Sequence, residues 1–149
     1  GGGFLMKRES CNPKNPEVEG TSNESLNHFI KKDIKHIINS TSNISVKGDN
    51  LCIAYQHEEK NYHARSFEDS FIHLNKPFVK KNKETFKGLK NKKDFDLEGD
   101  DSKDAYALAG NCILKKTHFA LDVIYHSSKN YDNWEIPSYI KEGLLWLQK

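Results

Sequence analysis

One short apolar run between stretches of helical periodicity sets the strongest constraint on how this chain folds. The run "LCIAYQ", Leu51 to Gln56, contains neither Gly nor Pro, and this composition predicts a buried β-strand. It is the one clear strand signal in the sequence, and a single strand leaves backbone N–H and C=O groups unpaired. We therefore expect an α/β fold that is rich in helix, has few strands of its own and needs further strands to complete its sheet.

Apolar residues recur at steps of three and four in the segments predicted to be helical. The predicted helices are residues 24–39, capped by Thr21, Ser22 or Asn23; 67–75, capped by Ser66; 102–126, with a break around Gly110; and 138–148, opened by Pro137. Their apolar faces comprise Leu26, Phe29, Ile30, Ile34, Ile37 and Ile38; Phe67, Phe71 and Leu74; Ala105, Leu108, Cys112, Phe119 and Val123; and Ile140, Leu144 and Leu147. Residues 1–20 lack periodicity and are predicted to be a loop or an added tail, with Gly1, Gly2 and Gly3 resembling a linker.

The charges are nearly balanced overall but unevenly distributed. The 23 Lys and Arg against 21 Asp and Glu leave a formal charge of +2, which favours no class of partner. Residues 76–93 are rich in lysine, whereas residues 94–104 are strongly acidic, and together they are predicted to form a long irregular connection. The lysine block would attract phosphates, as through Lys80, Lys81 and Lys83; a solvated loop is the other interpretation.

The cysteines and the hydropathy favour a cytoplasmic protein without a membrane partner. Cys11, Cys52 and Cys112 are odd in number and form no Cys-x-x-Cys pair, which is typical of reduced thiols. No histidine stands at zinc-finger spacing from a cysteine, and no apolar run approaches the ~20 residues that cross a bilayer.

The stretch "EVEG" has the letters of a metal-binding acidic motif. A carboxylate that holds a metal is usually fixed by the strand that precedes it, but the "CNPKNPE" before Val18 has two prolines and no apolar run. Glu19 is therefore not expected to be a catalytic acid. The "TSN" that follows is predicted to cap the first helix.

Five phrases in order resemble the C-terminal half of the Toprim nuclease domain of the OLD (overcoming lysogenization defect) family of ATP-dependent endonucleases. They are "KRES" followed by "TSN", then "IAYQ", "RSFEDSFIHLN", "KKTHFALDVI" and "IPSYIKEGLLWL". The resemblance runs from Lys7 to Leu147, and it identifies residues 21–149 as the C-terminal part of a Toprim-like domain. It implies a partial Toprim-like fold whose small parallel sheet is supplied in part by a missing segment.

The resemblance also implies an activity and partners. Family members join an ATPase domain to a Toprim domain that hydrolyses DNA with Mg²⁺ or Mn²⁺, and many act in defence against phages. The implied partners are DNA, the ATPase domain, the N-terminal half of the Toprim domain and further copies in a homo-oligomer; ATP would act only through the ATPase domain, which is absent from this chain. The family's Glu after the first strand and its Asp-x-Asp do not precede "KRES", and Asp94–Asp96 reads "DFD" only by coincidence, because it lies in a charged connection. By itself, the chain is expected to be nearly inert.

Carried over by position, Lys116 matches the family's catalytic lysine; its neighbour Lys115 is the alternative bearer of that role and a further contact to nucleic acid. Arg65 matches a second catalytic position and Glu68 a metal ligand. Each residue also has an ordinary interpretation: a solvated helix charge for Lys116, a first-turn residue favoured by the helix dipole for Glu68, and a surface ion pair for Arg65. The competing functions are a binding module that acts through residues 76–93 and an architectural piece packed on a sheet that another chain completes.

Overall fold

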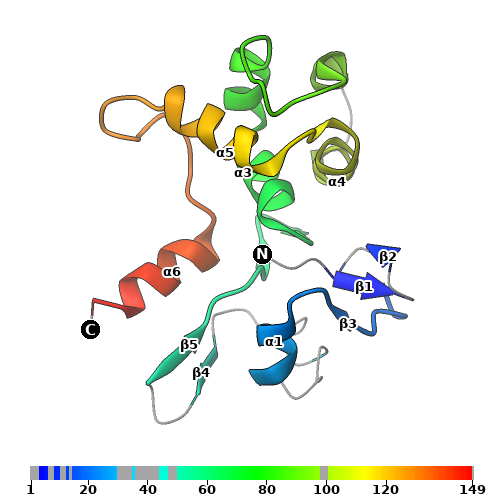
Figure 1. The fold of residues 1–149 in the computed structure, drawn as a ribbon, viewed down its shortest axis with the longest axis vertical. Coiled ribbons are helices and arrows are strands. Elements are labelled where there is room, and N and C mark those ends of the chain that lie inside the picture. The colour runs from blue at the N-terminus through cyan, green and yellow to red at the C-terminus, as the bar shows by residue number, and fades with distance from the viewer. Residues whose placement is uncertain are drawn as a thin grey trace. The chain divides into compact units, whose positions relative to one another are not determined.

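The computed structural model describes the chain except for residues 1–3, 7–8, 11–12, 14, 30–34, 36–43, 47–49, 98–100 and 149. It divides into two compact units, which are treated separately below (Figure 1). Unit 1 consists of Gly1–Phe67 and Ile136–Lys149, and unit 2 consists of Glu68–Glu135.

The described strands all lie in unit 1 and all pair antiparallel. A three-stranded sheet has the order β2-β1-β3, and two further pairs are β4 with β5 and β6 with β7. The strands are β1 (Phe4–Met6), β2 (Glu9–Ser10), β3 (Gly20–Thr21), β4 (Ile44–Val46), β5 (Leu51–Ile53), β6 (Glu58–Glu59) and β7 (Tyr62–His63). The short strands β1 and β2 fall in residues 1–20, where the sequence predicts no regular structure.

The predicted strand in "LCIAYQ" is confirmed over its first half. Strand β5 pairs with β4 in the register Ile44 to Ile53, so its partner comes from this chain. Residues 54–56 continue without strand pairing but stay near the core, since Tyr55 is only 3% exposed. A parallel sheet completed by a segment outside the chain stays a prediction.

Helix α1 (Glu24–Phe29) begins where the sequence places a cap. The backbone N–H of Leu26 donates to Oδ1 of Asn23 at 2.9 Å, which identifies Asn23 as the capping residue among the three candidates. The rest of the predicted apolar stripe, Ile30, Ile34, Ile37 and Ile38, lies outside the described residues.

Helix α6 (Ser138–Trp146) follows Pro137, as predicted, but it buries a different face. Tyr139 is its buried residue, whereas Leu144 and Leu147 are 55% and 73% exposed and Ile140 is half-buried. The prediction that these three aliphatic residues are buried is therefore wrong for Leu144 and Leu147. They line an open groove beside β5 instead.

Unit 2 contains α3 (Phe67–Asn82), the 3₁₀-helix η1 (Lys92–Asp96), α4 (Asp101–Cys112) and α5 (Lys116–Tyr125). The predicted irregular connection from residue 76 onward is wrong in its first part, because α3 continues through Asn82. Its stripe runs on through Phe78 and Val79, both buried among the lysines. The predicted break at Gly110 is also misplaced, since α4 continues to Cys112 and the break lies at residues 113–115.

Asn75 marks a kink inside α3. Its φ and ψ angles of −125° and 24° are not helical, and Pro77, two residues later, has no N–H to donate to the helix. The Asn75 side chain forms two hydrogen bonds with the backbone of Glu135: its Nδ2 donates to the Glu135 carbonyl at 2.9 Å, and its Oδ1 accepts from the Glu135 N–H at 2.6 Å. The buried amide thus fixes the segment that ends unit 2 against α3.

Aromatic rings form the core of unit 2. Phe71 on α3 lies with its ring centroid 5.8 Å from Phe119, 6.3 Å from Phe78 and 5.5 Å from Trp134. Phe86 extends the cluster, 5.9 Å from Phe119. The rings meet mainly edge to face, the arrangement their quadrupoles favour. Through Phe71, Trp134 is packed against this cluster.

Gly88 brings the backbone after α3 into direct contact with α5. Its carbonyl accepts from the N–H of Leu114 at 2.8 Å, and its N–H donates to Oδ2 of Asp122 at 2.7 Å. A Cβ at this position would lie 2.2 Å from the backbone nitrogen of Phe119. Only glycine allows this approach, which fixes where α5 begins.

We predict that Gly88→Ala lowers the free energy of unfolding of unit 2 by about 1–3 kcal/mol, because the added methyl must displace helix backbone rather than a side chain. Urea denaturation followed by Trp134 fluorescence in a Trp146→Phe background measures this effect. Gly110→Ala is the matched control: Gly110 is an exposed residue inside α4, and alanine there should raise stability by about 0.5–1 kcal/mol. Equal effects of the two substitutions would contradict the close approach at Gly88.

Candidate functional site

Unit 2 brings Lys116 and Glu68 together across 48 positions of sequence. Lys116 is the first residue of α5, Glu68 is the second residue of α3, and the Nζ of Lys116 donates to Oε2 of Glu68 at 3.1 Å. The contact between Phe71 and Phe119 lies one turn further along each helix and holds the two helices side by side. The packing of the aromatic core therefore sets the distance between Lys116 and Glu68.

The two side chains of the pair differ sharply in exposure. The Lys116 side chain is 65% exposed, whereas that of Glu68 is 11% exposed. An ammonium carries three N–H donors, so two of them stay available after the bond to Glu68. The buried Glu68 carboxylate therefore holds the Lys116 ammonium in place while leaving it exposed to solvent. Because the lysine is well solvated, the ion pair itself is expected to add less than about 1 kcal/mol to stability.

The second residue predicted to be catalytic, Arg65, lies in a different unit of the chain. Arg65 is half-buried and belongs to unit 1, in the segment between β7 and α3, whereas Lys116 and Glu68 belong to unit 2. Its proposed catalytic role stays a prediction from the resemblance.

The lysines predicted to contact nucleic acid divide into two groups. Lys80 and Lys81, in the last turn of α3, are exposed, and so is Lys115, which precedes α5. Lys83 is 8% exposed, and its ammonium is paired with the Asp96 carboxylate. The hydrogen bond from Lys83 holds the pKa of Asp96 below its usual value, so this carboxylate is ionised near neutral pH. A phosphate would have to compete with Asp96 for Lys83.

The described thiols are unreactive in character. Cys52 and Cys112 are free, and Cys11 lies outside the described residues. Burial, together with the nearby Asp94 carboxylate, raises the pKa of Cys112 to about 11, and burial also raises the pKa of Cys52. These observations agree with the expected reduced state and give neither thiol a nucleophilic role.

A magnesium site requires several oxygen ligands around one position. The described residues contain no group of three or more His, Cys, Asp and Glu side chains placed to hold a metal ion. Glu68 offers one carboxylate, but its Oε2 is already paired with an ammonium. One such carboxylate does not make a Mg²⁺ site, and no chemical step through a metal is derived from these residues.

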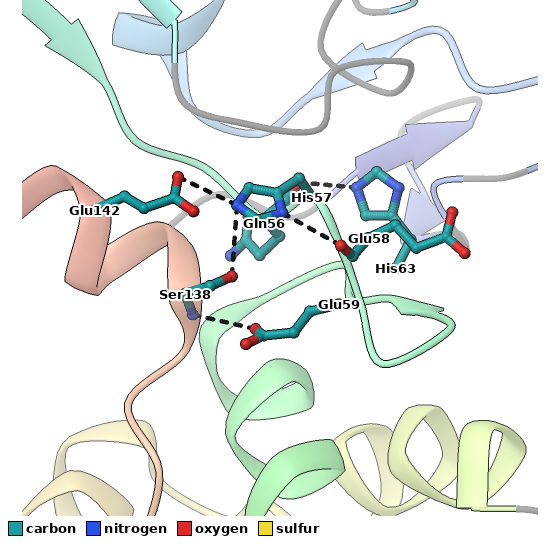
Figure 2. A network of polar contacts seen from close by, with 7 residues as sticks. All are labelled: Gln56, His57, Glu58, Glu59, His63, Ser138 and Glu142. Atoms are coloured by element: carbon teal, nitrogen blue, oxygen red, sulfur yellow. Dashed lines mark hydrogen bonds and ion pairs between the residues drawn. The ribbon is translucent and has the colours of Figure 1, made fainter.

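A second polar cluster lies in unit 1, and the sequence analysis missed it. Figure 2 shows the buried His57 ring between helix α6 and the hairpin of β6 and β7. Its Nε2 lies 3.5 Å from Oε2 of Glu142 and 3.5 Å from Oγ of Ser138, and its Nδ1 lies 3.3 Å from the Glu58 carbonyl oxygen. The stretch "QHEEKNYH" carries the density of His and Glu that could have drawn attention to it.

The geometry of this cluster does not suit nucleophilic catalysis. The contact of Ser138 with His57 is longer than the ~2.6–3.2 Å of a proton transfer, and Glu142 approaches the same ring nitrogen. The Ser138 N–H, at the start of α6, donates to Oε2 of Glu59 at 3.1 Å. The Glu59 carboxylate thus already takes up the backbone donor that would be needed to stabilise an oxyanion. The cluster is better explained as the contact that attaches α6 to the hairpin.

We predict that Glu59→Gln lowers the free energy of unfolding of unit 1 by about 0.3–1 kcal/mol. Glutamine keeps an oxygen for the Ser138 N–H but removes the negative charge at the positive end of α6. Urea denaturation followed by Trp146 fluorescence in a Trp134→Phe background measures the loss, which should shrink at high salt. Glu17→Gln, at an exposed site outside any helix, should leave stability unchanged; an equal loss there would contradict the helix-end explanation.

Comparison with known proteins relates the chain to a nuclease. It is 31% identical over 143 residues to a protein named Endonuclease GajA from Bacillus cereus (strain HuB5-5). The similarity covers 87% of this chain, and the chain spans about a fifth, 20%, of the length of that protein. No protein-family profile matches the sequence, and no solved structure matches it.

Within the described residues, no helix is both long and apolar enough to cross a membrane.

Proposed function

We propose that this chain contributes part of the active site of a DNA endonuclease of the OLD type, with Lys116 as its catalytic cation. One structural observation carries the proposal: Lys116 and Glu68, two residues that the resemblance singles out independently, lie 3.1 Å apart. The similarity to Endonuclease GajA supports the same class of activity.

The proposed chemistry is hydrolysis of a phosphodiester. Negative charge grows on the phosphoryl oxygens as water attacks and the leaving oxygen departs, and a cation fixed beside them stabilises that charge. Lys116 is suited to this task because its ammonium is exposed and keeps two donors free. Glu68 accepts the third donor and so holds the ammonium in one position.

The remaining parts of the site are proposed to come from a longer protein. The chain spans about a fifth of Endonuclease GajA, and the described residues lack a complete set of metal ligands. We propose that the Mg²⁺-binding carboxylates, an ATPase domain and a homo-oligomeric assembly belong to the full system, and that it acts in defence against phages. This chain by itself would then nick DNA weakly or not at all.

We predict that Lys116→Ala reduces nicking by at least about 100-fold in the longest natural protein that contains this sequence, since a transition-state contact of this kind is typically worth that much. The measurement is the conversion of supercoiled plasmid to the open circle with Mg²⁺ present. Circular dichroism and thermal melting should show an unchanged fold, because the side chain is 65% exposed.

Lys129→Ala is the control for this prediction. Lys129 is another exposed lysine of unit 2 and is not among the residues predicted to contact nucleic acid. Its substitution should change nicking by less than about threefold. Cleavage that survives Lys116→Ala, or that falls equally in both variants, would overturn the assignment.

A second candidate function is sequence-independent DNA binding through the end of α3. The observation that favours it is the exposure of Lys80 and Lys81 next to each other in the last helical turn. Such residues attract phosphates without reading bases, and each phosphate contact releases counterions.

We predict that the double substitution Lys80→Glu and Lys81→Glu weakens duplex binding and reduces the slope of log K against log salt by roughly two, because two phosphate contacts are lost. Fluorescence anisotropy between about 50 and 200 mM salt measures the slope. Lys129→Glu with Lys141→Glu changes the net charge equally at exposed sites elsewhere and should leave the slope unchanged. An affinity that stays flat with salt would exclude this second function.

A further inference from the structure

An open groove in unit 2 runs along the outer side of α5. It has a volume of about 820 Å³. The lining side chains come from two segments: Thr85 and Lys87 after α3, and His118, Leu121, Asp122, Ile124, Tyr125 and His126 on and just after α5. In Figure 1, α5 is the yellow-orange helix that carries most of this lining. The groove combines apolar, aromatic and basic groups, and neither the Lys116 pair nor the core uses it.

His126 is held rigidly at one end of the groove. Its ring stacks on Phe86, with centroids 5.2 Å apart and an angle of 22° between the planes. The Thr85 hydroxyl donates to the Asn82 carbonyl at 2.8 Å and lies 2.8 Å from Nε2 of His126. The stacking and this contact together fix the orientation of the ring.

Tyr125 stands beside this fixed ring and is almost fully in solvent. It is 84% exposed, and its ring lies 5.1 Å from His126 at 83°. Leu121 and Ile124, each 57% exposed, add an apolar surface on the same helix. Exposed aromatic and aliphatic groups around an open groove offer a flat ligand both stacking and apolar contact.

The charges of the groove indicate what kind of flat ligand fits. Lys87 and His118 are exposed and can meet a phosphate. Asp122 is half-buried, and its Oδ2 accepts a hydrogen bond from the Gly88 N–H. Its carboxylate would repel a phosphate placed beside it, but it can accept a hydrogen bond from an amino group on the edge of a base. A nucleotide fits these charges when the edge of its base faces Asp122 and its phosphate faces Lys87 and His118.

We propose that this groove binds a nucleobase of single-stranded DNA, stacked on Tyr125 with its edge toward the His126 ring, and with the adjoining phosphate on Lys87 and His118. A paired base in a duplex keeps its edge covered and its faces stacked, so the site selects an unpaired or extruded base. The choice of DNA as the ligand rests on the proposed function. Tyr125 lies nine residues along α5 from Lys116, a rise of about 13 Å and about two and a half turns, so the groove and the Lys116 pair lie on opposite faces of α5.

The test is fluorescence anisotropy with the full chain and a labelled single-stranded oligonucleotide, repeated with a duplex of the same sequence. Tyr125→Ala should weaken single-strand binding by about tenfold, since stacking on one base is typically worth that much, and duplex binding should change by less than twofold. Lys87→Ala should reduce the salt slope for single strands by a little under one. Tyr131→Ala, which removes another exposed tyrosine of unit 2 outside the groove, should leave the affinity unchanged.

Three results would overturn the inference: equal losses in Tyr125→Ala and Tyr131→Ala, duplex binding weakened as much as single-strand binding by Tyr125→Ala, or full competition by a free mononucleotide at equal concentration. The last result would identify a nucleotide site rather than a strand site. Nicking by the longest natural protein that contains this sequence is measured in parallel, to separate this inference from the proposed function. Lys116→Ala should abolish nicking yet keep single-strand affinity within about twofold, whereas binding that depends on Tyr125 without any nicking would reject the nuclease and retain the strand site.

Discussion

The close approach of Gly88 to the first turn of α5 is the constraint on which unit 2 depends. The missing side chain at Gly88 lets its backbone bond to Leu114 and to Asp122 and come within reach of Phe119. That approach sets the start of α5, and the aromatic cluster then sets its distance from α3. Lys116 and most of the groove residues lie on this one helix, so the positions of both candidate sites depend on the contact between the Gly88 and α5 backbones.

Periodicity predicted the helices of this fold better than its strands. The helical stripes led correctly to α1, α3 and α6, and the apolar run at Leu51 led to β5. The two- and three-residue strands β1, β2 and β3 are too short to show alternation, so no pattern could reveal them. The second half of α3 was missed for a different reason: lysines surround Phe78 and Val79, and the charge obscured a buried stripe.

The candidate site was accessible from sequence only as separate residues. The resemblance singled out Lys116 and Glu68, but their contact depends on the packing of two helices 48 residues apart, which no local pattern encodes. The pairing of Lys83 with Asp96 was hidden in the same way, because it joins a lysine block to an acidic one across a turn. Likewise, His57 became notable only once α6 placed Glu142 and Ser138 against its ring.

The buried thiol of Cys112 has a practical consequence for work on unit 2. It is fully buried at the end of α4, hydrogen-bonded to Asp94 at 3.7 Å, and its pKa is raised to about 11. A thiol-specific reagent therefore reaches it only when this part of the molecule opens. The rate at which Cys112 is labelled therefore reports how often this part of the molecule opens. A slower rate in the presence of a DNA strand would show that binding suppresses these openings, and no probe has to be attached to the binding surface.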